Sequence, residues 1–188
     1  RSRISGLKND LLTPDDFAQT VSEHRPHDQA VLSVYRRYQD RLRRANALDF
    51  DDLIMETVHL LGAFDAVAQN YRARFRHILV DEYQDTNPAQ YRLIRLLAGA
   101  DVPDGPTAEL TVVGDADQSI YAFRGATVRN IVEFEEDFPR AHVVLLEQNY
   151  RSTQTILSAA NAVIAHNDDR KDKRLWTDSG DGEKVTGW

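Results

Sequence analysis

Two adjacent carboxylates follow a short apolar run near the middle of this sequence. Residues 78–80 are apolar and mostly β-branched, and Asp81 and Glu82 come directly after them. This pattern is typical of a strand buried on both faces of a parallel sheet, where ligands lie at the carboxyl ends of the strands. Because adjacent strand residues point to opposite faces, we expect the two acids to have different tasks. One carboxylate can hold a hydrated Mg²⁺ and the other can orient or deprotonate a water, as hydrolysis of a nucleotide requires.

Polar clusters also follow two further predicted strands. Residues 110–113 and 142–146 are apolar runs like the first. The polar side chains that follow them are Asp115 and Gln118 after the second strand, and Asn149, Tyr150 and Arg151 after the third. Since the carboxyl ends of parallel strands meet at one edge of a sheet, we expect all three clusters there.

The elements around these clusters predict an α/β fold with an all-helical N-terminal part. Strands alternate with helices after about residue 76, which indicates βαβ units and a parallel sheet. Thr13, Asp49, Thr127 and Ser152 are predicted N-caps, and Gly99 is a predicted helix stop. Helices are predicted to start at Thr13 and Ser152 and to cover residues 28–45, 49–62, 67–75, 88–97 and 127–137. Helical spacing puts Val34 and Tyr35 on one apolar face of the helix over residues 28–45, and Phe50, Leu53 and Val58 on the apolar face of the helix over residues 49–62.

Composition limits the class of protein. The chain has 188 residues, a net charge of -7 and no cysteine, which is typical of a globular protein in a reducing cytoplasm. No apolar run approaches the ~20 residues that cross a bilayer, so no membrane partner is expected. Arginines cluster within residues 36–44, and Arg and Lys cluster within residues 170–174; each cluster is either a solvated surface or a nucleic-acid contact. The first residue is Arg1 rather than Met, so we expect a piece of a longer protein.

The polar clusters resemble the motifs of superfamily 1 DNA helicases of the UvrD/PcrA/Rep family. Residues 80–87 (Val-Asp-Glu-Tyr-Gln-Asp-Thr-Asn) are similar to the family's Walker B motif. Residues 113–126 and 148–153 resemble its third and fourth motifs, and residues 48–54 resemble the segment where the chain re-enters the first motor domain. The resemblance covers essentially the whole chain.

The resemblance implies roles at a nucleotide site for ATP and Mg²⁺. Asp81 would hold Mg²⁺, and Glu82 would activate the attacking water. Gln118 would sense the γ-phosphate and couple it to DNA. Tyr150 would stack on adenine, and Arg151 would act as an arginine finger. These roles suit phosphoryl transfer, which is catalysed mainly by positioning and charge stabilisation.

The resemblance also implies a surface for single-stranded DNA. Tyr121 and Phe123 would stack on bases, and Arg124 would link that surface to the nucleotide. Stacking on aromatic rings tolerates any base sequence, as a translocating motor requires. The position of Phe123 is commonly Trp in relatives, so this chain would offer a smaller ring there. From the residues alone, packing in the protein core explains these two aromatic side chains as well as base stacking does.

The family implies a RecA-like sheet of the P-loop NTPase type, present here in part. Residues 1–47 would be a helical accessory segment, residues 48–150 the later half of the first motor domain, and residues 151–188 the start of the second. The implied activity is ATP-driven 3′-to-5′ unwinding in DNA repair and replication. The implied partners are single-stranded and duplex DNA, together with repair proteins.

One expected feature is missing from the sequence. Nothing matches the phosphate-binding pattern G-x-x-x-x-G-K-[ST], and Gly182 and Lys184 lie in what we interpret as a solvated turn. We therefore expect the chain to be an internal fragment that does not hydrolyse ATP alone. Two alternatives stay open, namely a non-catalytic DNA- or protein-interaction module and part of a related helicase-nuclease subunit.

Overall fold

The structure is a computed structural model, and it describes residues 2–22, 24–100, 102, 107–119, 129–132, 134–166 and 173–186. The chain divides into two compact units, Arg1–Ile131 and Val132–Trp188, which are described separately below.

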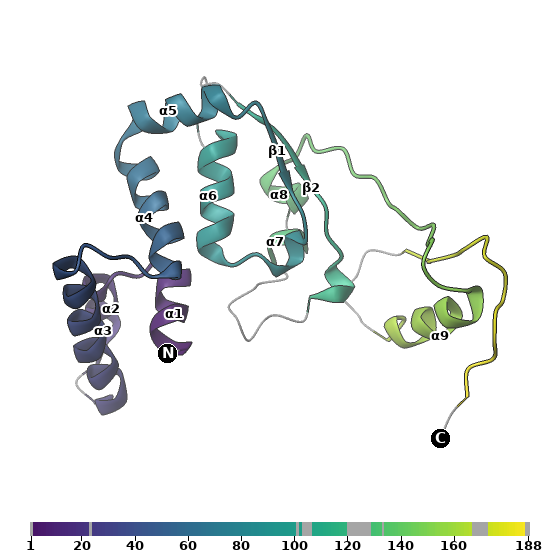
Figure 1. Ribbon diagram of the computed structural model, residues 1–188, viewed down its shortest axis with the longest axis horizontal. Coiled ribbons are helices and arrows are strands. Elements are labelled where there is room, and N and C mark those ends of the chain that lie inside the picture. The colour runs from purple at the N-terminus through teal and green to yellow at the C-terminus, as the bar shows by residue number, and fades with distance from the viewer. Residues whose placement is uncertain are drawn as a thin grey trace. The chain divides into compact units, whose positions relative to one another are not determined.

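The first unit contains most of the secondary structure (Figure 1). Across the described ranges, no helix combines the length and the apolar character needed to cross a bilayer. The elements of both units, in chain order, are α1 (Ser2–Asn9), α2 (Pro14–Thr20), α3 (Pro26–Arg44), α4 (Phe50–Ala63), α5 (Asp65–Arg74), β1 (His77–Val80), the 3₁₀ helix η1 (Tyr83–Asp85), α6 (Pro88–Ala98), β2 (Glu109–Val112), the 3₁₀ helix η2 (Ala116–Gln118), α7 (Arg129–Val132), α8 (Phe134–Asp137) and α9 (Gln154–Ile164).

Local capping chemistry sets several of these boundaries. The Thr13 side chain accepts a hydrogen bond from the Asp16 amide, and the Asp16 carboxylate accepts one from the Thr13 amide. Asp49 and Asp52 form the same reciprocal box at the start of α4. Gly99 ends α6 in a left-handed conformation, with φ 75°. The predicted caps Thr13 and Asp49 and the predicted stop Gly99 are therefore confirmed. The predicted cap Ser152 was wrong, because α9 has Thr153 as its N-cap, and Thr127 lies outside the described residues.

The first three helices pack around a small apolar core. Leu7, Phe17 and Tyr35 are its buried members, and the Tyr35 hydroxyl donates to the Leu12 carbonyl over 3.0 Å. Val34, which sequence periodicity placed on the same face as Tyr35, is 57% exposed instead. The buried stripe of α3 is therefore narrower than periodicity suggested.

A buried ammonium group joins α1, α3 and α4. Lys8 is 1% exposed, and its Nζ donates to Asp49 Oδ2 over 2.7 Å and to Asp52 Oδ1 over 2.8 Å. Gln39 Nε2 donates to the same Asp52 oxygen over 2.9 Å, and the Tyr38 hydroxyl donates to Asp49 over 2.9 Å. A buried lysine is stable only when its charge is paired in this way.

This network also determines which face of α4 is buried. Apolar periodicity placed Phe50 and Leu53 in the core, but they are 84% and 53% exposed. That prediction was wrong because Asp52, which is fully buried, occupies the inward position and meets Lys8. Val58, which was also predicted to be inward, is buried.

Two parallel strands form the sheet of the first unit. β1 pairs with β2 in the register Val80↔Val112, and α6 makes the crossover between them. Figure 1 shows α6 between α4 and the strands, and it contacts both α4 and α5. Leu79 is 78% exposed, so the prediction that the first strand is buried on both faces was wrong. Among the described residues, no element covers the side of β1 to which Leu79 points.

The second unit contains α8 and α9. The prediction of a strand at residues 142–146 was wrong, because this segment belongs to no strand. Val144 and Leu146 are 64% and 76% exposed. An apolar run becomes a strand only where it pairs with a neighbour, and the described part of this unit offers none to it. The pairing that is present is a single parallel bridge between Gln148 and Trp176.

We expect Lys8→Met to lower the free energy of unfolding by about 3 kcal/mol, because Asp52 would stay buried without its cation. Urea denaturation of the chain measures this change. The matched control is Arg44→Ala, which removes an exposed pair with Asp40 and should cost less than about 1 kcal/mol. Equal effects of the two substitutions would contradict the role assigned to the network.

The pKa of Asp49 gives this network a dependence on pH. Burial opposes ionisation, but hydrogen bonds from Lys8, the Asp52 amide and Tyr38 outweigh it and hold the pKa of Asp49 below its ordinary value of 3.8. The ionised carboxylate therefore stabilises the fold at pH values above 3.8, and this stabilisation is lost as the pH falls through the lowered pKa of Asp49. We expect Asp49→Asn, which keeps a good N-cap, to be less stable than the unmodified chain at pH 6. The difference should shrink at pH 3 in chemical denaturation, and a constant difference would refute the assignment.

Candidate functional site

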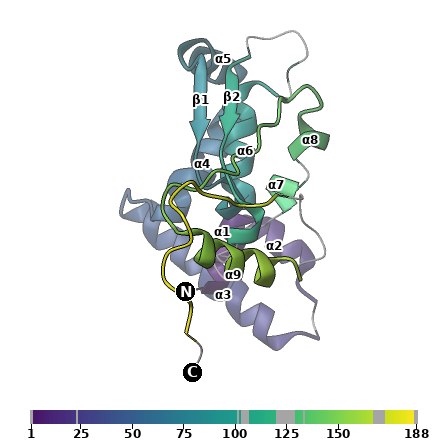
Figure 2. The same ribbon diagram turned by 90° about the vertical axis from the view of Figure 1, so that its right-hand side faces the viewer.

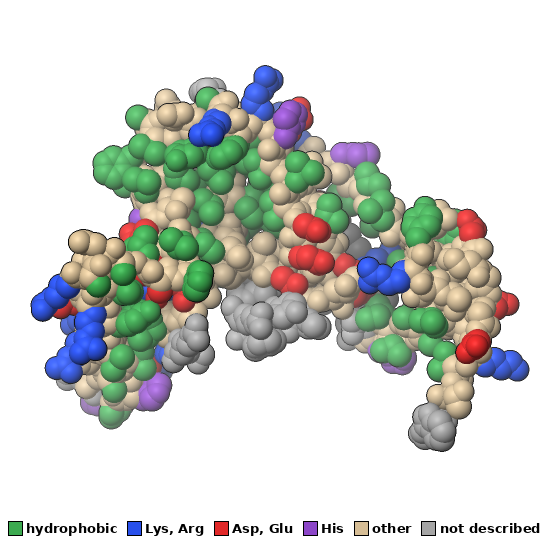
Figure 3. Space-filling view, in the orientation of Figure 1, with side chains coloured by type: hydrophobic (Ala, Val, Ile, Leu, Met, Phe, Trp, Pro, Cys, Tyr) green, Lys and Arg blue, Asp and Glu red, His purple; other side chains and the backbone are tan. Residues whose placement is uncertain are grey.

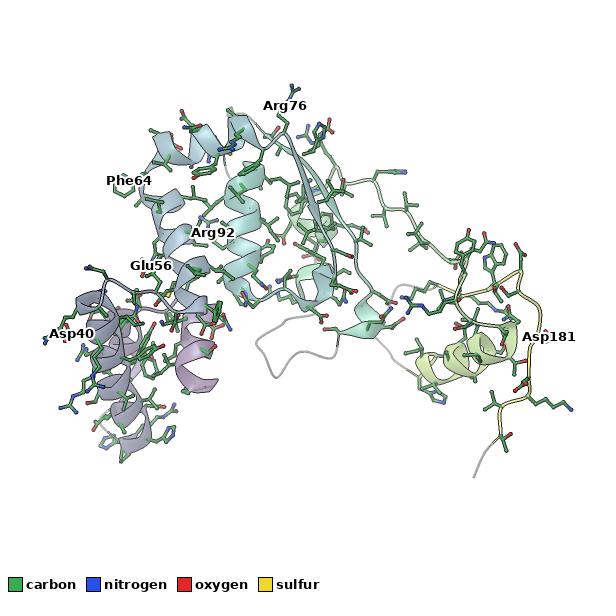
Figure 4. All side chains as sticks on the ribbon, viewed as in Figure 1. Asp40, Glu56, Phe64, Arg76, Arg92 and Asp181 are labelled. Atoms are coloured by element: carbon green, nitrogen blue, oxygen red, sulfur yellow. The ribbon has the colours of Figure 1, made fainter. Side chains whose placement is uncertain are left out.

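The parallel register brings two of the predicted polar clusters to one edge of the sheet. The Val113 amide donates to the Val80 carbonyl over 2.8 Å, and the Tyr83 amide donates back to the Val113 carbonyl over 3.0 Å. The residues after β1 and those after β2 therefore emerge side by side. Arg76, labelled in Figure 4, precedes β1 at the opposite end of the sheet.

Asp81 and Glu82 both lie on the surface just beyond β1. Figure 3 shows acidic side chains gathered at this end of the strands. Glu82 has a left-handed backbone with φ 48° and ψ 44°, and its amide donates to Asp81 Oδ1 over 2.9 Å. Strand alternation was expected to point the two carboxylates to opposite faces of the sheet. That expectation was wrong, because β1 ends at Val80 and both residues lie in a bend. A non-glycine residue held in this region costs of order 1–3 kcal/mol, and such positions cluster at functional sites.

A buried amide connects the acids to the second strand end. Gln84 is 1% exposed, and its Nε2 donates to Glu82 Oε2 over 2.7 Å. Its Oε1 accepts from the Asp115 amide over 2.9 Å. The Ser119 hydroxyl also donates to the backbone carbonyl of Gln84 over 3.4 Å. One side chain therefore bonds to the loops after both strands.

The loop after β2 is organised by the Asp115 carboxylate. Its Oδ1 accepts from the Asp117 amide over 3.0 Å, and its Oδ2 accepts from Gln118 Nε2 over 2.8 Å. Hydrogen bonds thus run without interruption from Glu82 through Gln84 and Asp115 to Gln118. Of the predicted site residues, Asp81, Glu82 and Gln118 lie at this edge.

The donor set suits a magnesium ion bound together with a nucleotide. Asp81 presents a solvent-facing carboxylate, and Mg²⁺ commonly takes one or two protein carboxylates, with water and substrate phosphates completing its shell. The described residues hold no group of three or more His, Cys, Asp or Glu that would form an all-protein metal site. Tyr121, Phe123 and Arg124, the residues predicted to contact DNA, lie outside the described residues.

The second unit carries the remaining predicted site residues. Tyr150 is 83% exposed, and its hydroxyl donates to Gln148 Oε1 over 2.9 Å. Gln148 Nε2 in turn donates to Asp178 over 2.9 Å. Asn149 Oδ1 accepts from the Arg151 amide over 2.8 Å, which fixes the turn that carries the arginine. The ring of Tyr150 is thus tethered at the surface with an open face, as a stacking residue requires.

Sequence reasoning assigned no role to Gln84 or to Asn130. Asn130 is buried, and its Nδ2 donates to the Thr86 carbonyl over 3.2 Å and to its hydroxyl over 3.0 Å. The only indication in the sequence was the position of Gln84 two residues after an acid. That position does not reveal burial or a hydrogen-bond partner after the next strand.

Gly114 lies too close to Gln84 for any side chain of its own. A Cβ at this position would be 2.7 Å from Gln84 Oε1 and 2.8 Å from Ile131 Cδ1. We expect Gly114→Ala to lower the free energy of unfolding by about 1–3 kcal/mol through overpacking. Thermal or urea denaturation measures this loss.

Gly62 provides the matched control for this substitution. It lies within α4, and a Cβ at its position would have no neighbouring atom within 4 Å. We expect Gly62→Ala to raise stability by about 0.5–1 kcal/mol, because alanine loses less chain entropy in a helix. A Gly114→Ala variant as stable as the original chain would show that Gln84 is free to move.

Comparison with known proteins places the chain among helicases. Residues 1–139 match the family model described as the UvrD/REP helicase N-terminal domain, and residues 144–187 match the UvrD-like helicase C-terminal domain. The chain is 63% identical over 187 residues to the ATP-dependent DNA helicase UvrD1 of Mycobacterium tuberculosis, covering 98% of this chain and 24% of that protein. It is 50% identical over 183 residues to the ATP-dependent DNA helicase PcrA of Leuconostoc citreum, covering 97% of this chain and 23% of that protein.

The chain spans about a quarter of the length of these relatives. Its two matched segments follow each other in the order N-terminal domain, then C-terminal domain. The matches include both the strand-end acids of the first unit and the tethered tyrosine of the second. On this basis, the chain belongs to the UvrD/REP helicase family.

Proposed function

We propose that this chain is part of the motor of an ATP-dependent DNA helicase. The observation that carries the proposal is the hydrogen-bonded path from Glu82 to Gln118 at the carboxyl edge of two parallel strands. Relatives that match nearly the whole chain are named ATP-dependent DNA helicases. Ligands of parallel α/β sheets bind at this edge.

The acids at the strand end have separate roles in hydrolysis. Glu82 orients the attacking water and accepts its proton, while Asp81 holds Mg²⁺. The ion, when bound, neutralises phosphate charge that would otherwise oppose attack. The strained backbone of Glu82 supports a functional role for this residue, because non-glycine residues held in the left-handed region cluster at functional sites.

The nucleotide and DNA contacts follow from the other motifs. Gln118 senses the γ-phosphate, Tyr150 stacks on adenine, and Arg151 stabilises the charge that develops on the transferred phosphoryl group. Tyr121 and Phe123 stack on the bases of single-stranded DNA, and Arg124 connects them to the nucleotide site. Movement along that strand is 3′-to-5′ and separates the duplex ahead, in the service of DNA repair and replication in the cytoplasm.

The chain contributes parts of two RecA-like motor domains rather than a complete one. We assign residues 1–47 to a helical accessory segment, residues 48–150 to the first motor domain and residues 151–188 to the second. No G-x-x-x-x-G-K-[ST] pattern occurs in the chain. Another part of the full-length protein therefore supplies the phosphate loop, and the 188-residue chain does not turn over ATP by itself.

We expect ATP hydrolysis stimulated by single-stranded DNA in the full-length protein that contains this chain, and none in the 188-residue chain. Glu82→Gln should lower turnover by about 10²–10⁴-fold, because it removes the group that accepts the proton of the attacking water. Release of inorganic phosphate measures the rate in each case.

The matched control is Glu56→Gln, which neutralises an acid on α4 beside His59 (Figure 4). It should leave turnover unchanged. A full-length protein without DNA-stimulated turnover would favour the non-catalytic interaction module instead. Turnover by the 188-residue chain that Glu82→Gln removes would show that this chain binds phosphate through a segment not recognised above.

A further inference from the structure

We propose that Gln84 is a positioning residue that holds the Glu82 carboxylate in its working orientation and ties it to the Gln118 loop. This inference rests on the proposed function, since it concerns the water-activating acid of that site. Gln84 itself touches neither nucleotide nor water in the proposal and acts only through Glu82.

The orientation of the Gln84 amide is set by its surroundings. Its Oε1 lies 2.9 Å from the Asp115 backbone amide, which can only donate. Turning the side-chain amide over would place two donors against each other. The NH₂ group must therefore face Glu82 Oε2, which lies 2.7 Å away. This donor favours one position of a carboxylate that otherwise lies at the surface.

The Gln84 side chain is also held by its packing. The Gln84 side chain is 1% exposed. Gly114 leaves room for it, because a Cβ on residue 114 would lie 2.7 Å from Gln84 Oε1. Its neighbour Tyr83 is fully buried. A group held by packing and by two hydrogen bonds keeps its partner within the narrow geometry that efficient catalysis needs.

The same side chain links two groups that must act together. Asp115, whose amide bonds to Gln84, accepts a hydrogen bond from Gln118 over 2.8 Å. A shift of the Gln118 loop on meeting a phosphate would therefore move the Asp115 amide and, through Gln84, the acid that prepares the water. Correct placement of the phosphate would then be a condition for correct placement of the Glu82 carboxylate.

Gln84→Glu separates this role from a purely structural one. The substitution keeps an oxygen that accepts from the Asp115 amide and keeps the shape of the side chain. It replaces the donor that faces Glu82 with a second carboxylate oxygen. A residue that only joins the two loops would lose stability on this change while the folded protein kept its kcat, whereas a residue that orients Glu82 would also lose kcat.

In the full-length protein, we expect Gln84→Glu to lower kcat for DNA-stimulated ATP hydrolysis by about 10–100-fold, the scale of a misplaced catalytic group. KM for ATP should stay within about two-fold, because no nucleotide contact is removed. The matched control is Gln90→Glu, which adds the same charge to the capping box of α6 and keeps its acceptor oxygen. It should change neither constant.

A second readout needs no nucleotide. In the 188-residue chain, Gln84→Glu sets a carboxylate against Glu82 and, at the longer distance of 3.4 Å, against Asp85. We therefore expect its urea midpoint to fall relative to the original chain as the pH rises from about 4 to 7. Gln90→Glu should show no such relative fall. This measurement tests the contact itself, independently of catalysis.

The outcomes separate the two proposals. An active protein in which Gln84→Glu leaves kcat unchanged would overturn the positioning role while the proposed function stands. A urea midpoint with the same pH dependence in both variants would overturn the contact. A full-length protein that shows no DNA-stimulated turnover would remove the proposed function, and the positioning role with it.

Discussion

An ammonium group that loses its water must be surrounded by carboxylates, and Lys8 imposes this condition on the first unit. Its partners come from the start of α4, and a glutamine of α3 satisfies the same acid, so three helices must arrive together for the charge to be buried. Removing one partner of such a buried pair costs far more than the pair contributes to stability. The orientation of α4, and through it the contacts that α4 makes with α5 and α6, follows from this condition.

At the strand ends, a buried neutral amide likewise requires hydrogen-bond partners from more than one segment. Gln84 is buried between two loops, and both ends of its amide have partners there. A half-satisfied amide would be costly in that setting, so the two loops must keep both bonds to Gln84. The chain belongs to the UvrD/REP helicase family, and the function proposed above requires the acids of this site to hold their positions while a nucleotide is exchanged.

Local chemistry was predictable from sequence, whereas long-range burial was not. The boxes at Thr13 and Asp49 and the stop at Gly99 involve residues close in the chain, so short patterns identify them. Parallel pairing followed from the alternation of strands and helices. The burial of Lys8 depends on acids more than forty positions away, and the exposure of Leu79 depends on what covers the sheet; neither is encoded in a local pattern. Similarly, the acids at the strand end were recognisable by type, but their connection through Gln84 was not.

The sheet of the first unit has only two strands in the described part of the chain, and this affects how its backbone exchanges hydrogen with solvent (Figure 2). In a parallel pair, each strand directs alternate amides toward its neighbour and the others away from it. Slow-exchanging and fast-exchanging amides should therefore alternate along both strands. A peptide-averaged experiment would report a half-protected segment and suggest partial unfolding, although every second amide is firmly bonded. Residue-level exchange is needed to distinguish a narrow sheet from a loose one.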